Sequence, residues 1–242
     1  MHRVEDWLSD VQPDVVCLQE TKLADSAFPA MSFSSLGYDS VHHGEGRWNG
    51  VAILSRVGLE GPELGFGPND DDPQARLVWA TCGGVRVASA YVPNGRSLDD
   101  DHYTYKLAWL SKLRTKLEQE SDPQQPLIIA GDYNIAPSDI DVYDPSKFVG
   151  ATHTSEPERA ALGELLDWGL VDTFRELEPA DKIYSWWDYR GGDFHMHRGM
   201  RIDLVLATRT LSNAAHFATV DRQARKGDKP SDHAPVIIDF DL

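Results

Sequence analysis

Short apolar runs that end in a polar residue recur along the chain, and they predict more strands than helices. Apolar runs bounded by turn residues are typical of strands, whereas apolar positions three and four apart are typical of helices. Strands are therefore expected at 14–21, 50–56, 85–92, 127–134, 201–208 and 235–240. Helices are expected at 4–12, 102–120 and 157–169.

The longest of these helices, 102–120, is expected to be amphipathic and to end at the break SDPQQP. Its helical spacing is carried by Tyr105, Ala108, Trp109, Lys112 and Leu113. No long linker separates the strands from the helices. The pattern therefore favours one layered α/β domain over 1–242 rather than two domains.

Composition supports a folded protein without a membrane segment. The 242 residues are 41% hydrophobic, which is enough for a sizeable core. No apolar run approaches the roughly 18 residues that a membrane span needs, and the N-terminus lacks the apolar stretch of a secretory signal. We expect a soluble cytoplasmic protein. Cys17 and Cys82 have neither metal-site nor disulfide-framework spacing, and buried thiols are the simpler interpretation.

The net charge of −16 argues against nonspecific attraction to polyanions over most of the surface. It does not exclude a substrate that carries phosphate. Cations can gather on one face, and a centre rich in carboxylates can hold a divalent metal that reverses the local charge.

Polar side chains repeatedly stand where an expected strand meets a loop. They are Glu20, Tyr91, Asn94, Asp132, Asn134, Asp203, Asp232 and His233. If these strand ends meet at one edge, they form an acidic pocket. Carboxylate oxygens suit Mg²⁺ or Mn²⁺, whose remaining ligands are commonly water and substrate phosphate. This pattern indicates metal-assisted cleavage of phosphodiesters.

Each of these residues also has a simpler structural explanation. Asp132 alone would be read as a turn former or helix cap, and Glu20 as part of an exposed turn. Asp203 has Arg201 two residues away on the same strand face. Residue His233 would suit a core position, and Tyr91 would suit packing with its hydroxyl satisfied. Only their joint occurrence favours a site.

Seven motifs carry a resemblance that covers essentially the whole chain. They are LQETKL (18–23), NGVAILSR (49–56), YVPNG (91–95), GDYNIAPSDIDVYDP (131–145), YSWWDYR (184–190), RIDLVLA (201–207) and SDHAPV (231–236). In this order they resemble the exonuclease III family of apurinic/apyrimidinic (AP) endonucleases, within the endonuclease, exonuclease and phosphatase superfamily. SDH is common across the superfamily, whereas GDYNIAP, YSWWDYR and RIDLVLA are more specific to the DNA-repair branch.

The resemblance implies a DNase I-like four-layer α/β sandwich, in which two mixed or antiparallel sheets pack face to face between helices. It implies a Mg²⁺-dependent hydrolase, with Mn²⁺ as an alternative, that incises duplex DNA 5′ to abasic sites. Activity at 3′ ends, as 3′–5′ exonuclease or 3′-phosphatase, is also implied, and we expect a monomer. Two alternatives stay open: a phosphoesterase acting on RNA, inositol phosphate or a phospholipid head group, and a catalytically weakened DNA-binding relative.

The resemblance also implies roles at the metal and the attacking water. Glu20 would coordinate the metal, with Asp232 in or near its coordination shell. Asp132 would orient or deprotonate the attacking water, and Asn134 would hold that water or the scissile phosphate.

Other roles implied by the resemblance concern the phosphate. His233, bonded to Asp203, would place positive charge beside the phosphate oxygens. Tyr91 would donate a hydrogen bond to the phosphate or assist the leaving oxygen, and Asn94 would add a donor.

The segment YSWWDYR and the residue before RID imply a small pocket for a baseless deoxyribose. Its walls would be Trp187 and Met200, and Arg96 would reach into the duplex. The alternative is a hairpin whose aromatic side chains pack inward, which is expected of one of the two tryptophans. The family usually begins with a strand of the type SWNVNG, whereas Met1 falls in the helix that follows such a strand. We therefore expect an N-terminally truncated form of the domain.

Overall fold

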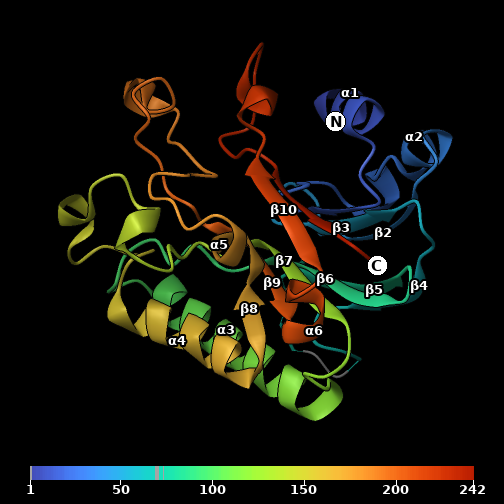
Figure 1. Ribbon diagram of the computed structural model, residues 1–242, viewed down its shortest axis with the longest axis horizontal. Coiled ribbons are helices and arrows are strands. Elements are labelled where there is room, and N and C mark those ends of the chain that lie inside the picture. Colours follow the sequence, from blue (N-terminus) through green and yellow to red (C-terminus); the bar gives the residue numbers. More distant parts are fainter. Residues whose placement is uncertain (1, 69–70, 73) are drawn as a thin grey trace. The chain divides into compact units, whose positions relative to one another are not determined.

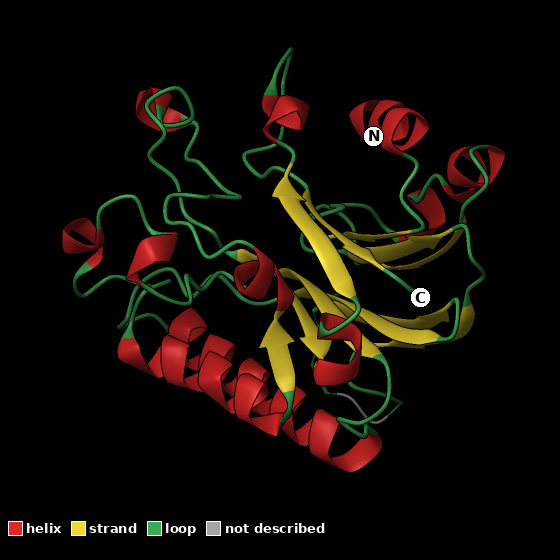
Figure 2. Ribbon diagram, viewed as in Figure 1, coloured by secondary structure: helices red, strands yellow, loops and turns green. Residues whose placement is uncertain are grey.

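The structure is a computed structural model that describes residues 2–68, 71–72 and 74–242 (Figure 1). The chain divides into two compact units. The first consists of Met1–Tyr91 with Pro126–Gly131, and the second of Val92–Gln125 with Asp132–Leu242. Each unit combines strands and helices (Figure 2).

The first unit contains two short helices and most of the strands. Its helices are α1 (His2–Val11) and α2 (Ala30–Ser35). Its strands are β1 (Val15–Leu18), β2 (Asp39–His43), β3 (Val51–Ser55), β4 (Glu60–Leu64), β5 (Leu77–Cys82), β6 (Val85–Tyr91) and β7 (Leu127–Asp132), of which Asp132 itself belongs to the second unit. The order is β1-β3-β2 in one sheet, and β4, β5, β6 and β7 are successive neighbours in another.

Strand β3 lies between β1 and β2, antiparallel to both. All five of its residues are buried, as expected for an apolar run without polar alternation. Leu54 of this strand packs with Leu8 of α1, Phe33 of α2 and Tyr38. Both helices of the first unit therefore share one hydrophobic cluster with the central strand of this sheet.

The second unit contains the two long helices, α3 (Asp101–Glu120) and α4 (Glu156–Trp168), which pack side by side (Figure 1). Its other elements are β8 (Leu170–Asp172), α5 (Thr173–Leu177), β9 (Asp203–Thr208), α6 (Arg209–Ser212), β10 (Ala215–Val220) and β11 (Val236–Phe240). Strands β8 and β9 pair antiparallel, as do β10 and β11. Short 3₁₀ turns at 139–141, 145–148, 190–192 and 222–225 interrupt the loops.

The buried face of α3 differs from the expected one. Its buried residues are Tyr103, Lys106, Trp109, Leu110, Leu113, Lys116 and Leu117. Ala108 is exposed, and Tyr105 and Lys112 are only partly buried. The amphipathic helix is confirmed, but the lysines on its buried face are Lys106 and Lys116, whereas the sequence pattern included Lys112. The side chain of Asp100 caps the helix by accepting a hydrogen bond from the amide of His102 at 2.8 Å.

Every strand and helix expected from the sequence is present, with boundaries shifted by a few residues. Strands β2, β4, β5, β8 and β10 were not expected. Strand β4 reads EGPEL and is mostly exposed, and β2 reads DSVHH, so neither has the apolar run that marks a strand. Strand β8 has only three residues, too few for a periodic pattern.

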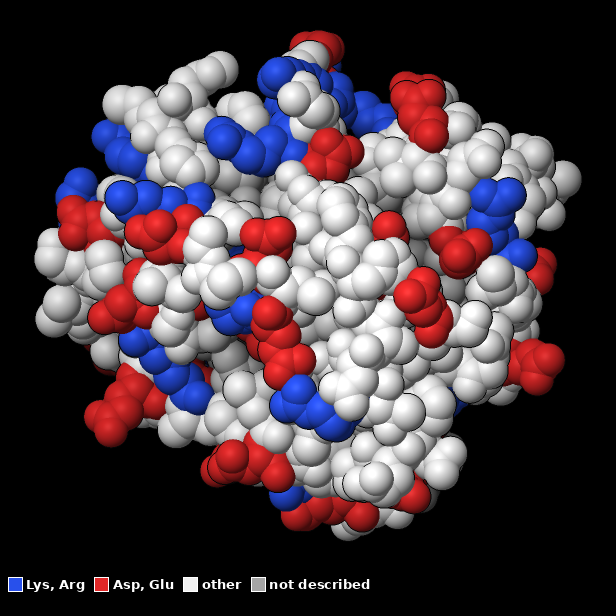
Figure 3. All heavy atoms as spheres, in the orientation of Figure 1, with Lys and Arg blue, Asp and Glu red and all other residues white. Residues whose placement is uncertain are grey.

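Both cysteines are free thiols, and Cys82 is buried. Burial, with a smaller contribution from Cys82, raises the pKa of Cys17 to about 12. This supports the interpretation of small thiols that serve packing. No helix among the described residues is both long enough and apolar enough to cross a membrane. On the face shown in Figure 3, acidic and basic side chains are interspersed.

Gly131, next to the end of β7, is required by close approach of the backbone. A Cβ at this position would lie 1.9 Å from the carbonyl oxygen of Ala90 in the neighbouring strand β6. We expect Gly131→Ala to lower the free energy of unfolding by about 3 kcal/mol, because the strands have to separate to admit the methyl group. Urea unfolding monitored by tryptophan fluorescence measures this.

Gly163→Ala is the matched control. A Cβ at Gly163, inside α4, meets no atom within 4 Å. Alanine there should raise the free energy of unfolding by about 0.5–1 kcal/mol, since glycine is unfavourable inside a helix. A Gly131→Ala protein as stable as the wild type would show that the close approach is not a constraint.

Candidate active site

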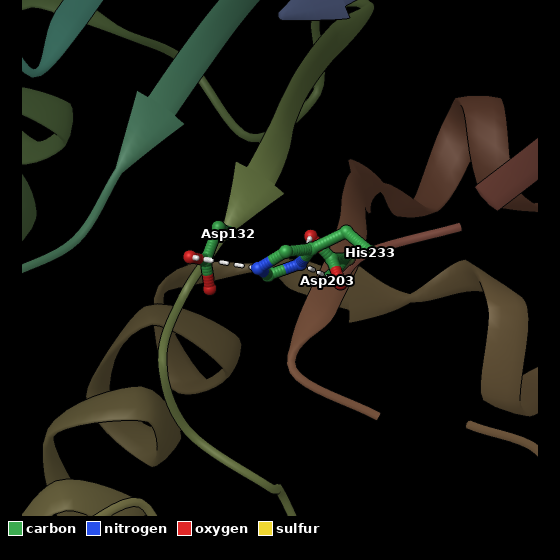
Figure 4. Close-up of side chains that lie close together, drawn as sticks. All are labelled: Asp132, Asp203 and His233. Carbon is green, nitrogen blue, oxygen red and sulfur yellow. Dashed lines mark hydrogen bonds and ion pairs between the residues drawn. The ribbon is translucent and has the colours of Figure 1, made fainter. Parts of the chain in front are cut away.

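Three titratable side chains of the second unit meet where strands give way to loops (Figure 4). Asp132 ends β7, Asp203 begins β9, and His233 lies in the loop before β11. One ligand atom from each lies within 4.8 Å of the others. In Figure 4 the imidazole ring lies between the two carboxylates. Residues separated by as many as 101 positions in the sequence, Asp132 and His233, thus belong to one charged cluster, as the strand-end pattern predicted.

The imidazole of His233 is held by Asp203. Its Nδ1 lies 3.0 and 2.9 Å from the two carboxylate oxygens of Asp203, and its Nε2 lies 4.0 Å from Oδ2 of Asp132. Burial opposes the charged form. The charge and hydrogen bond of Asp203 outweigh it, with Asp132 and Asp232 contributing, and they raise the pKa of His233 to about 10. At neutral pH the ring is therefore an imidazolium between carboxylates, and it is not a lone core histidine.

The loop after β7 is fixed by its own side chains. The carboxylate of Asp132 accepts hydrogen bonds from the backbone amide of Asn134 at 2.8 Å and from its Nδ2 at 3.0 Å. Asn134 has φ +52°, a left-handed conformation in which asparagine is enriched among non-glycine residues. Both residues are only 4% exposed. The interpretation of Asp132 as a turn former is therefore correct but incomplete. The same carboxylate holds the turn and also faces His233.

Asn94 joins this loop from the segment after β6. Its Nδ2 donates to Oδ1 of Asn134 at 2.9 Å, so the two amides are aligned. Arg96 is exposed, and its Nη1 lies 4.0 Å from Oδ2 of Asp100. The structure thus brings Asn94 to the Asp132 cluster and leaves Arg96 on the surface.

Glu20 and Tyr91 meet in the first unit. The hydroxyl of Tyr91 donates a hydrogen bond to Oε1 of Glu20, and Nζ of Lys22 lies 2.6 Å from Oε2. Glu20 has φ +49°, and its side chain is 40% exposed. The guanidinium of Arg76 lies over the ring of Tyr91, 4.6 Å from its centroid. A carboxylate and a phenol predicted to share a site are therefore direct partners.

Asp232 is held by the YSWWDYR segment. The indole Nε1 of Trp186 donates to Oδ2 of Asp232 at 3.1 Å, and the backbone of Trp186 forms isolated bridges with His233 and with Met200. The backbone carbonyl of Asp232 accepts hydrogen bonds from the amide of Trp187 at 3.0 Å and from Arg225 at 3.2 Å. This pairing fixes the loop that carries Asp232 and His233.

The structure corrects two pocket residues. Trp187 has no exposed surface and packs on Tyr184 and Ala234, so it cannot line an accessible pocket in this conformation. Met200 is 2% exposed and packs with Ile202 beside the partly buried Trp186. Of the two tryptophans, the inward-facing one is Trp187. Strand alternation does not decide between them, because the segment is irregular rather than a regular strand.

Arg201 does not pair with Asp203. It has no exposed side-chain surface, and its guanidinium donates to Asp141 at 2.7 Å and to both oxygens of Asp172 at 3.0 and 2.7 Å. Burial alone would raise the pKa of Asp141, but Arg201, and then Arg175, hold it below its usual range. The pairing leaves the carboxylate of Asp203 for His233 and anchors the start of β9.

The cluster contains the donors that a divalent cation needs. Asp132, Asp203 and His233 form the one group of three such ligands found among the residues that the structure describes. Its two carboxylates offer oxygen ligands, which suit Mg²⁺ or Mn²⁺.

Sequence reasoning missed the buried ion pairs around the cluster. They are the pairs of Arg201 with Asp141 and Asp172, and of Lys106 with Glu158. One available signal was the capping-box spacing of Ser155 and Glu158, at the start of a helix that was expected. Another available signal was Lys106, a lysine on the core side of the expected helix 102–120.

Comparisons with known proteins place the chain among DNA-repair nucleases. The model of the endonuclease/exonuclease/phosphatase family matches residues 1–233. Exodeoxyribonuclease III of Haemophilus influenzae is 36% identical over 251 residues, covering 99% of this chain and 94% of that protein.

Two solved structures are also similar. An AP endonuclease from Archaeoglobus fulgidus superposes with a TM-score of 0.95 at 36% identity, covering 100% of this chain and 94% of that one. A 3′ phosphatase, NExo, from Neisseria, bound to a product DNA hairpin, has a TM-score of 0.96 at 39% identity, with the same coverage of 100% and 94%. These matches confirm the expected DNase I-like α/β fold with mixed sheets.

We expect Arg201→Met to lower the free energy of unfolding by about 3–5 kcal/mol, because it leaves the buried carboxylate of Asp141 with less compensating charge. Arg209→Met is the matched control. Arg209 pairs with Glu176 at 2.6 Å, but both side chains are more than a third exposed, at 59% and 42%. Its loss should change stability by less than about 1 kcal/mol. Equal effects in urea unfolding would contradict the importance of burial.

Proposed function

Because the chain belongs to the endonuclease/exonuclease/phosphatase family, in the branch of exonuclease III and the AP endonucleases, we propose that it is a Mg²⁺-dependent DNA-repair phosphodiesterase. Its substrates are duplex DNA with abasic sites, incised on the 5′ side, and duplex 3′ ends, acted on as 3′–5′ exonuclease and 3′-phosphatase. The observation that carries this proposal is the arrangement of His233 between Asp203 and Asp132.

In the proposed reaction the carboxylate of Asp132 acts on the attacking water, and the imidazolium of His233 acts on the phosphate. Asp132 orients the attacking water and takes its proton, and Asn134 holds that water or the scissile phosphate. Asn94 supports the same group through its bond to Asn134, at 2.9 Å. These three side chains form one hydrogen-bonded network between the loops after β6 and β7, so they are placed before substrate arrives.

His233 supplies positive charge to the phosphate oxygens. Its raised pKa, to about 10, keeps the proton on the ring at neutral pH, so the ring cannot act as the general base. Asp203 fixes the orientation of the ring through Nδ1, which leaves Nε2 to donate. A fixed donor aimed at developing negative charge stabilises the transition state more than mobile water does.

Glu20 and Asp232 keep the metal roles that the family resemblance gives them. Each offers a carboxylate oxygen, and Tyr91 donates to Glu20 in the first unit, which orients that carboxylate. Mg²⁺ or Mn²⁺ held by these carboxylates would stabilise the charge that develops on the departing 3′ oxygen. We propose that Tyr91 contacts the phosphate through the same hydroxyl once substrate is bound.

For the abasic sugar we propose Trp186 in place of Trp187. Trp186 is only partly buried and packs in the cluster that contains Met200 and Ile202. Met200 then supports the pocket from behind rather than lining it. Arg96, which is exposed, keeps its proposed contact with the duplex. We further propose that residues 1–242 act as one catalytic domain, as a cytoplasmic monomer.

Chelation tests the metal requirement. Cleavage of a fluorescent duplex with one abasic site should stop in EDTA and return with excess Mg²⁺ or Mn²⁺. The carboxylates of the site repel the scissile phosphate unless a divalent cation offsets their charge. The product is followed on a denaturing gel. Undiminished incision in EDTA would rule out the metal-dependent mechanism.

Asp132→Asn and His233→Ala should each reduce kcat for incision at least about a hundredfold, because each removes a positioned catalytic group. Asp139→Asn is the matched control, since Asp139 is 69% exposed and pairs with Arg159 outside the cluster. It should retain wild-type kcat.

The substrate panel separates the alternatives. Abasic duplex, intact duplex, duplex with a 3′ phosphate, single-stranded RNA and inositol phosphate are assayed in parallel. Preference for RNA or inositol phosphate would replace the DNA-repair proposal, and affinity for abasic duplex without Mg²⁺-dependent incision would indicate a DNA-binding protein that has lost catalysis. Near-normal kcat in Asp132→Asn or His233→Ala would refute the role of that residue.

A further inference from the structure

A buried ion pair lies beneath the two asparagines of the site. Lys106, on the inner face of α3, bonds through Nζ to Oε1 of Glu158, in the first turn of α4, and neither side chain has any exposed surface. Buried charges of this kind are rarely required for stability alone, because an apolar pair of similar volume is often as stable. The other hydrogen-bond partners of Lys106 and Glu158 therefore indicate what the ion pair does besides stabilising the fold.

Glu158 is fully satisfied by its own surroundings. Besides Lys106, its carboxylate accepts hydrogen bonds from Thr152 Oγ1 at 2.7 Å, from the amide of His153 at 3.0 Å, and from the amide and hydroxyl of Ser155 at 3.1 and 2.7 Å. With Ser155 it forms the capping box of α4. The carboxylate of Glu158 therefore accepts enough hydrogen bonds to cap α4 without Lys106.

The remaining bonds of Lys106 go to the site. Its Nζ donates to the backbone carbonyl of Asn134 at 2.7 Å and reaches that of Asn94 at 3.4 Å. The same carbonyls lie next to two neighbours of Glu158: His153 Nδ1 donates to Asn134 at 2.6 Å, and Thr152 Oγ1, whose single proton is shared with Glu158, lies 3.1 Å from the carbonyl oxygen of Asn94. Both asparagine carbonyls are therefore tied to one buried charge pair.

Fixing these carbonyls fixes the side chains. Asn134 is in a left-handed conformation, with φ +52°, that non-glycine residues seldom adopt. In that conformation its amide and side chain both bond to Asp132, and its Oδ1 accepts from Asn94. If Asn134 left this left-handed conformation, its carbonyl would move away from Lys106 and its side chain would move away from Asp132.

We propose that Lys106, held by Glu158, is a positioning residue for the reaction: it locks the Asn134 and Asn94 peptides so that their side chains and Asp132 present one fixed hydrogen-bonding surface to the phosphate and the attacking water. The inference rests on the proposed function for its effect on catalysis. Its structural part, the locking of residues 132–136, stands on the contacts alone.

The test uses the double variant Lys106→Met/Glu158→Gln. It removes both charges together, so no buried charge is left unpaired, and glutamine at this position retains the capping box. We expect kcat for incision of abasic duplex to fall about ten- to hundredfold with KM unchanged within about threefold, since misplacement by an ångström is enough for such a loss. Hydrogen–deuterium exchange of a peptide spanning 130–138 should become faster in the absence of any substrate.

Lys116→Met is the matched control. Lys116 is the other lysine on the buried face of α3, 7% exposed, and it pairs with Glu120 at 2.6 Å. Its loss removes a lysine charge from the same helix without touching the asparagines. Wild-type kcat and wild-type exchange at 130–138 are expected. If the double variant does not fold, Lys106→Arg gives the comparison, because it keeps a positive charge beside Glu158 and displaces the donor from the asparagine carbonyls.

Two outcomes overturn the proposal. One is kcat within twofold of wild type, and the other is unchanged exchange at 130–138 in a folded variant, even if the reaction is slower. If the wild-type protein shows no Mg²⁺-dependent incision, the proposed function fails, and the exchange measurement alone decides whether Lys106 locks the loop.

Discussion

Charged side chains that leave water need a partner of opposite charge, and this constraint accounts for the arrangement of the second unit. Arg201 is paired with Asp141 and Asp172, Lys106 with Glu158, and His233 with Asp203. Each pair joins segments far apart in the chain. The first anchors the start of β9, the second supports the loop after β7, and the third holds His233 in the cluster with Asp132.

The pairings are also selective. Asp203 has an arginine two residues away, yet it bonds to His233 because Arg201 is fully engaged by two other carboxylates. A histidine whose proton is retained by such a neighbour behaves as a fixed cation over the physiological range. The positive charge of the ring is then preset, and the polarity of the cluster does not depend on small changes of pH.

Sequence reasoning predicted residues that the structure brings together, but it missed most of the residues that support them. Asp132, Asp203 and His233 were predicted because acids and a histidine at strand ends, in the order of a known family, identify a centre without knowledge of side-chain direction. Trp186 and Trp187 were not separated, since their segment lacks the period that assigns faces. Lys106 was missed because its partner lies 52 residues away, and strands β2 and β4 because their sequences are polar.

The two cysteines bear on how the protein can be handled. With its pKa near 12, the thiol of Cys17 is almost wholly protonated at neutral pH, and burial raises the pKa of Cys82 as well. Thiolates, not thiols, react with maleimides and peroxides. A single cysteine introduced on the surface would therefore take up a fluorescent label selectively, with both native sulfurs left in place.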